Sequence, residues 1–103
     1  MSKKFASKDP QEVLLLTFDF SEVIDDPTEV ITGVTWTVTL SRGTDVSNPI
    51  LMLYGTPAID GLYCSHLVQL GSNDNDYLVS ALVTTNKNQV IKLSGVLPVV
   101  TQS

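Results

Sequence analysis

The sequence holds a single cysteine, Cys64, and a single histidine, His66, and this scarcity excludes several kinds of site. One cysteine cannot form a disulfide within the chain, so the fold must depend on packing and strand pairing. A structural zinc site needs four Cys or His ligands, which one subunit cannot supply. On one face of a strand, residues two apart are about 6.5 to 7 Å from each other, too far for the direct hydrogen bond of a thiol and its catalytic base. We therefore expect a core thiol beside an edge histidine, and no enzyme.

Positive charge is also scarce, with six Lys and Arg against eleven Asp and Glu and a net charge of −5. Such a surface is not suited to neutralising nucleic-acid phosphates or binding anionic lipid. No run approaches the ~18 apolar residues of a membrane span, and no apolar stretch follows the N-terminal lysines as it would in a signal peptide. A glycine-rich phosphate loop is missing too. We expect no nucleic acid, membrane or cofactor as a partner.

Charged residues of both signs are few for a soluble protein, at 17% of the chain against 43% hydrophobic residues. About 25% charged residues is usual for a soluble domain, and a disordered chain would be much poorer in hydrophobic residues. The composition therefore predicts a folded protein with surfaces that are buried against neighbours.

A period of two dominates what is present, in a chain of 103 residues that is long enough for one domain. Between Gly33 and Leu40, apolar residues that include Trp36 share one face, and threonines share the other. Valine and threonine are β-branched and favour strands over helices. Further strands are predicted at 13–20, 50–54, 62–70, 77–85 and 89–96, with turns at 25–27, 41–43, 47–49, 55–57, 71–75 and 86–88. Six or seven short strands predict an all-β sandwich or a small barrel.

The segment 9–16 carries two patterns. Asp9 as N-cap, Pro10 as first helical residue and Glu12 reaching back are typical of a helix start. Alternation continues to Phe20, however, and a helix that ended at Leu16 would have only about two turns. We favour a strand here.

Both ends of the chain are candidate partner contacts. We expect residues 1–10 to form an exposed arm, residues 11–100 a single sandwich domain and residues 101–103 a short tail. The arm carries two bases and one aromatic anchor, and the other end is apolar where a free terminus should be polar. The residues expected to bind a partner are Lys3, Lys4, Phe5, Leu97, Pro98 and Val99.

Carboxylates gather in two loops, and the second, with Asp74 and Asp76, alternates oxygen donors as a calcium loop does. It lacks the glycine at the sixth position and the glutamate at the twelfth that an EF-hand loop needs. Asn and Asp also serve tight turns that require left-handed backbone, which is the interpretation we favour. Calcium at Asp74 and Asp76 stays open.

The chain resembles a known family in the order and spacing of its strand and turn motifs between residues 8 and 100. The family is that of small virion proteins of tailed bacteriophages called fibre-tail adaptors. The matching motifs are Lys8-Asp9-Pro10, Glu12-Val13-Leu14, Phe18-Asp19-Phe20-Ser21, Thr35-Trp36-Thr37-Val38, Ile59-Asp60-Gly61, His66-Leu67-Val68, Leu70-Gly71, Tyr77, Thr84-Thr85, Ile91-Lys92-Leu93-Ser94-Gly95 and Leu97-Pro98-Val99.

The resemblance implies an immunoglobulin-like antiparallel β-sandwich with no catalytic residues. It implies a structural protein of the virion, assembled in the host cytoplasm, that links neighbouring tail, fibre or capsid subunits as a fibre-tail or head-tail adaptor. The contacts would be made by strand edges, loops and the N-terminal arm, in a symmetric multicopy assembly.

Two alternatives remain open at this point. One is a capsid cement or decoration protein, which would need the same compact sandwich. The other is a carbohydrate- or cell-surface-binding module that stacks sugars on Trp36, Tyr54, Tyr63 or Tyr77. The second requires exposed aromatic rings, whereas the alternation places Trp36 in the core.

Overall fold

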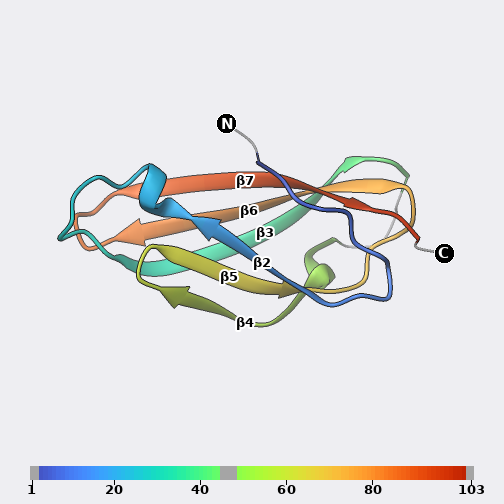
Figure 1. Ribbon diagram of the computed structural model, residues 1–103, viewed down its shortest axis with the longest axis horizontal. Helices are drawn as coiled ribbons and strands as arrows, with labels where there is room; N and C mark the ends of the chain where they lie inside the picture. The colour runs from blue at the N-terminus through green and yellow to red at the C-terminus, as the bar shows by residue number, and fades with distance from the viewer. Residues whose placement is uncertain (1–2, 45–48, 102–103) are drawn as a thin grey trace.

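The computed structural model describes residues 3–44 and 49–101, which form two β-sheets packed against each other (Figure 1). There are two short 3-10 helices in the described residues: η1 follows β2, and η2 precedes β4. The elements are β1 (Lys3–Lys4), β2 (Leu14–Asp19), η1 (Phe20–Glu22), β3 (Ile31–Arg42), η2 (Pro49–Met52), β4 (Leu53–Asp60), β5 (Tyr63–Val68), β6 (Asn75–Thr85) and β7 (Val90–Val99). The predicted all-β sandwich is confirmed.

The strand order identifies the type of sandwich. One sheet has the order β1-β7-β6-β3 and the other β2-β5-β4, and all pairs are antiparallel except β1 with β7. If β2 to β7 are lettered B to G in chain order, β2, β5 and β4 are strands B, E and D of one sheet, and β3, β6 and β7 are strands C, F and G of the other. This is the arrangement of an immunoglobulin domain. Tyr77 at the start of β6 accepts a hydrogen bond from the Ser72 N–H at 3.0 Å, the tyrosine corner of such folds. The fold is an immunoglobulin-like sandwich.

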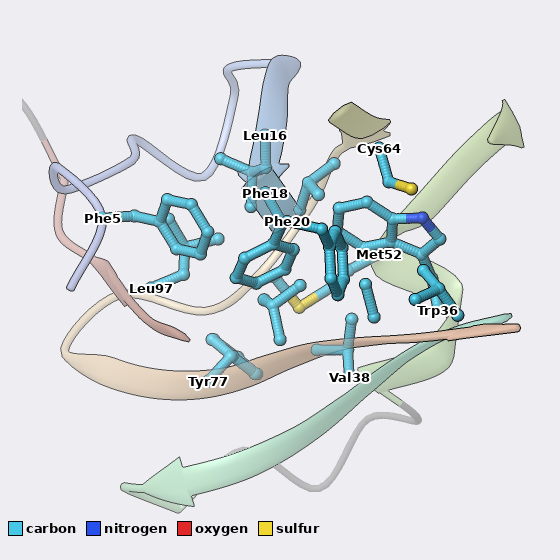
Figure 2. Close-up of a cluster of buried hydrophobic side chains, with 14 of the residues drawn as sticks. Phe5, Leu16, Phe18, Phe20, Trp36, Val38, Met52, Cys64, Tyr77 and Leu97 are labelled. Carbon is cyan, nitrogen blue, oxygen red and sulfur yellow. The ribbon is translucent and has the colours of Figure 1, made fainter. Parts of the chain in front are cut away.

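Alternation along the strands builds the core between the sheets. On β6, Tyr77, Val79, Ala81 and Val83 are all fully buried, as their shared face predicts. Trp36 of β3 is buried as well. A chain of ring contacts joins Phe5, Phe18, Trp36 and His66, with successive centroids 5.5, 5.3 and 5.5 Å apart. Figure 2 labels the first three of these rings. The core thus runs across both sheets and includes the N-terminal segment.

Strand β4 differs most from its prediction. Residues 50–52 belong to η2, and the strand begins at Leu53 instead. The predicted turn at 55–57 lies inside β4 as a bulge, because Tyr54 is opposite Leu67 and Ala58 is opposite Ser65. An edge strand accommodates a bulge and a proline without losing ladder bonds to a second neighbour. Ser47 and Asn48, in the turn predicted at 47–49, lie outside the described residues.

The ambiguous segment 9–16 uses both of its patterns. Glu12 accepts the Asp9 N–H at 2.7 Å and Asp9 accepts the Gln11 N–H at 2.8 Å, which is the hydrogen bonding of a helix start. The helix does not continue, because from Leu14 the chain pairs with β5 and buries Leu16 and other alternate side chains. The predicted strand is confirmed, with a capped turn before it.

Candidate interaction surfaces

The N-terminal segment lies along β7 instead of extending into solvent. Strand β1 pairs in parallel with Gly95 and Val96, and the Phe5 N–H donates to the Val96 carbonyl at 2.9 Å. Further on, Lys8 exchanges backbone hydrogen bonds of 2.9 and 2.8 Å with Pro98 and Val100. Phe5 and Lys8 are buried. The expected exposed arm is therefore wrong for these two side chains, because β7 offers a free edge for pairing.

Lys8 is the least expected of the buried residues, with no exposed surface. Its Nζ donates to the carbonyls of Leu70 at 2.7 Å and Asp9 at 2.8 Å. Burial lowers the pKa of this amine, against the opposing effect of the Glu12 and Asp9 carboxylates. These contacts, here called the Lys8 anchor, tie the N-terminal segment to the loop between β5 and β6. Residue type does not distinguish this lysine from the exposed Lys4, although only Lys8 belongs to a motif of the family, Lys8-Asp9-Pro10.

The residues expected to bind partners differ in how far the fold buries their side chains. Leu97 and Val99 are fully buried and Phe5 is 8% exposed, so these side chains are used inside the fold. The C-terminal apolar run is not a free tail, because β7 continues to Val99 and pairs there with β6. Pro98 is half-buried and Lys4 is exposed, and the side chain of Lys3 lies outside the described residues. Gln102 and Ser103 of the expected tail lie outside them too.

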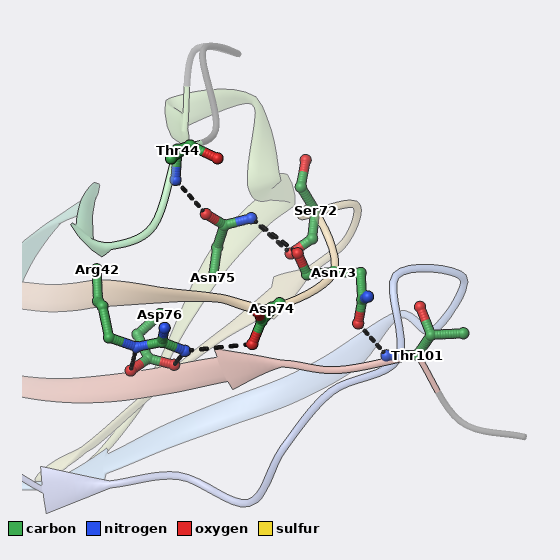
Figure 3. A network of polar contacts seen from close by, with 8 residues as sticks. All are labelled: Arg42, Thr44, Ser72, Asn73, Asp74, Asn75, Asp76 and Thr101. Carbon is green, nitrogen blue, oxygen red and sulfur yellow. Dashed lines mark hydrogen bonds and ion pairs between the residues drawn. The ribbon is translucent and has the colours of Figure 1, made fainter.

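Asn75 organises the loops at the end of the sandwich that contains the Lys8 anchor (Figure 3). Its buried side chain accepts the Thr44 N–H at 2.8 Å and donates to the carbonyls of Ser72 and Asn73 at 3.1 and 3.0 Å. Gly43 passes so close that an added Cβ would lie 1.7 Å from the Asn75 Oδ1, and its φ of +124° also requires glycine. One amide therefore joins two loops.

The second carboxylate group faces a guanidinium. Arg42 Nε donates to Asp76 at 2.9 Å, and an Arg42 nitrogen lies 3.7 Å from Asp74. Asp74 adopts a φ of +64°, the left-handed conformation that turn chemistry predicts for Asp. A calcium ion at these carboxylates would have to displace Arg42. Among the described residues, no three His, Cys, Asp or Glu side chains gather as a metal site would require.

Cys64 and His66 lie in the core side by side on β5. Burial raises the pKa of the Cys64 thiol, which disfavours the thiolate that a nucleophile needs. His66 is 5% exposed and packs edge-on against Trp36, and its Nδ1 lies 2.9 Å from the Leu67 carbonyl. A carbonyl only accepts, so Nδ1 carries the proton of that bond. Both residues have packing roles in this arrangement.

The aromatic side chains considered for sugar stacking are in different surroundings. Trp36 and Tyr77 are buried, whereas Tyr54 and Tyr63 are 50% and 49% exposed. The exposed pair lies on β4 and β5, on the outer face of the three-stranded sheet. Tyr54 is opposite Leu67, four residues from Tyr63 and about 13 Å along the strand. The two rings do not form one platform for a single sugar.

That outer face also carries exposed leucines. Leu67 of β5 is flanked by Leu15 of β2 on one side and by Tyr54 of β4 on the other, and we call these three residues the apolar row. They are 36%, 61% and 50% exposed, respectively. The sequence could have predicted one exposed leucine here. Leu14, Leu15 and Leu16 are consecutive, and successive residues of a strand point to opposite faces.

Comparison with known families supports the same kind of protein. A family model described as podophage GP4 fiber-tail adaptor protein gp77 matches residues 8–98. The chain belongs to this podophage fibre-tail adaptor family. No curated protein and no solved structure gives a significant match.

The fibre-tail adaptor match covers β2 to β6, nearly all of β7 and the Lys8 anchor, but leaves out β1. Family membership confirms a structural protein of the phage particle and the resemblance noted from the sequence motifs. Within the described part of the chain no helix is long and apolar enough to cross a bilayer. Contacts by Lys3 and Lys4 lie outside the match and are a separate hypothesis.

Proposed function

We propose that this chain joins fibre and tail proteins in the podophage particle through non-catalytic protein contacts. The observation that carries the proposal is the family match over residues 8–98. The geometry supports it, because the apolar row is exposed on a domain whose core is complete without it. Exposed apolar groups that a fold does not need are typical of interaction sites.

The contacts we propose involve strand edges, loops and the N-terminal segment. Strands β3 and β4 are each the last strand of their sheet, so each presents an edge that a partner strand can pair with. On the other side of the molecule, at β1 and β7, we propose further partner contacts by Lys3, Lys4 and Pro98. Many symmetric copies, each weakly bound, would give a durable assembly in the virion after synthesis in the host cytoplasm.

Quantitative mass spectrometry of purified particles tests the proposal. We expect the protein at a copy number that is a multiple of the tail symmetry, and retained on tails after the capsids have been disrupted. Absence from the particles would refute a structural role. Retention on capsids alone would instead indicate a capsid cement protein.

The role of the N-terminal lysines needs substitutions instead of a deletion. Removing residues 2–8 would also remove Phe5 and Lys8, which are buried in the domain. The double variant Lys3→Glu and Lys4→Glu keeps both and reverses the charge. We expect fewer copies per particle, with Lys87→Glu in the exposed 86–89 turn as the control. Equal incorporation of both variants would show that the two lysines contact no partner.

A further inference from the structure

The outer face of the three-stranded sheet is a grid of three rows, each with one residue from β2, β5 and β4. The apolar row is Leu15, Leu67 and Tyr54, and the middle row is Thr17, Ser65 and Ala58. The last is Asp19, Tyr63 and Asp60, here called the acidic row. The alternate residues of β2 and β5, such as Leu16 and His66, point into the core.

In the part of the chain that the structure describes, the apolar row is not part of the hydrophobic core. Its three side chains are between 36% and 61% exposed, while the core below them is closed by Leu16 and Val68. Three further exposed apolar residues lie next to these strands in the sequence, since Val13 precedes β2, Leu51 lies in η2 before β4 and Leu70 follows β5.

The other end of the grid carries only negative charge. Asp19 and Asp60 are both opposite Tyr63, one on each side. Strands β2, β4 and β5 contain no Lys or Arg, so all the formal charge that these three strands carry is negative. On β2 and β5 the acidic row lies four residues from the apolar row, which is about 13 Å along the strand.

We propose that this face docks a partner protein of complementary chemistry, namely an apolar side chain on the apolar row and a Lys or Arg about 13 Å away on the acidic row. The inference rests on the proposed adaptor function and names the surface and the chemistry of one of its partners. Apolar burial would supply affinity, and the carboxylates would set orientation and the response to salt.

A second copy of this chain is the weaker occupant. Two copies that used the same face would bring acids together with no base on either side, and each copy carries a net charge of −5. A copy that offered its opposite sheet would form a front-to-back contact, which builds a ring or an open filament and again brings together two chains that each carry a net charge of −5. A different, basic partner avoids this repulsion.

Incorporation into particles measures the contribution of the apolar row. We expect the double variant Leu15→Ser and Leu67→Ser to reduce the copies per particle about tenfold or more. The control is Leu82→Ser with Val90→Ser, which removes exposed apolar groups from the other sheet. Thermal unfolding of both purified variants checks that they fold. If wild type, the Leu15→Ser/Leu67→Ser variant and the control all enter particles at the same copy number, this inference fails but the adaptor function stands. If wild type itself is absent from particles, the adaptor function fails as well.

Salt tests the acidic row. Asp60→Asn keeps the shape of the side chain and leaves Asp19, which accepts the Ser21 N–H that begins η1, in place. We expect particles with Asp60→Asn to lose the protein at a lower NaCl concentration than wild type. The control Asp25→Asn removes an exposed acid outside the grid and should match wild type. Equal salt release of Asp60→Asn and wild type would overturn the electrostatic part.

Photo-cross-linking identifies the occupant. Tyr54 replaced by p-benzoylphenylalanine keeps an aromatic ring at the apolar row, and the cross-linked peptide is sequenced from assembled particles. We expect a peptide of another virion protein, with an apolar residue cross-linked and a Lys or Arg nearby. A cross-link to a second copy of this chain, or to a partner surface without a base, would overturn the proposal.

Discussion

Two regions of this domain reverse the usual distribution of residues. At the Lys8 anchor a lysine is fully buried, whereas in the apolar row leucine and tyrosine side chains are 36% to 61% exposed. The lysine is tolerated inside because carbonyls of Leu70 and Asp9 accept its hydrogen bonds. Among the described residues, the apolar row is not part of the buried core cluster. The difference teaches that a charged side chain can be buried where its hydrogen bonds are satisfied, while apolar side chains can stay on the surface, which is why we propose the apolar row as a contact for a neighbour.

The sharpest test of the exposed region uses two adjacent leucines on β2. Leu16→Ser should lower the free energy of unfolding by about 3 kcal/mol or more, because it empties a core position and buries a hydroxyl. Leu15→Ser should change it by no more than about 0.5 kcal/mol. Urea unfolding measures both. Similar losses in the two variants would show that the apolar row supports the fold and is not free for binding.

At the buried region, Lys8→Met should cost about 1 to 3 kcal/mol at neutral pH, since the carbonyls of Leu70 and Asp9 lose their donor. The difference from wild type should depend on pH. Folding lowers the Lys8 pKa below its ordinary value of 10.5, so in the window just below pH 10.5 the unfolded chain holds more protons. Wild-type stability should therefore rise with pH there relative to Lys8→Met. Parallel pH profiles from chemical unfolding would contradict an amine with a lowered pKa.

The tyrosine corner lies at the same end of the sandwich as the Lys8 anchor. Tyr77→Phe removes only the hydroxyl that accepts the Ser72 N–H and keeps the buried ring. We expect a loss of about 1 kcal/mol, seen as a lower urea midpoint with an unchanged slope. A loss near zero would mean that water replaces the hydroxyl as acceptor for Ser72.

The smallest effect is expected at the ion pairs on the surface near this end. Arg42→Gln removes the contacts to Asp76 and Asp74 in a region where the Arg42 side chain is 59% exposed. The expected loss is smaller than that of Tyr77→Phe and should vanish in high salt. A loss as large as that of Tyr77→Phe that persists in high salt would show that Arg42 has a packing role as well.

Much of the fold could be predicted because alternation is local. The inner face of β6 and the place of Trp36 in the core followed from a period of two. The bulge at 55–57 did not, because glycine and proline there are equally typical of a turn and of an edge strand. The burial of Leu97 and Val99 could not be predicted, because pairing of β7 with β6 up to Val99 involves residues distant in sequence.

By itself the amino-acid sequence determined the class of protein: strands from alternation, no disulfide from a single cysteine, and a phage adaptor family from the order of its motifs. Only the tertiary structure decided which apolar and charged groups face outward. Pairing of β2, β5 and β4 aligned Leu15, Leu67 and Tyr54 in one row, and packing of the loops enclosed Lys8. The physical reason is that a surface combines residues far apart in the chain, whereas strand propensity depends on near neighbours.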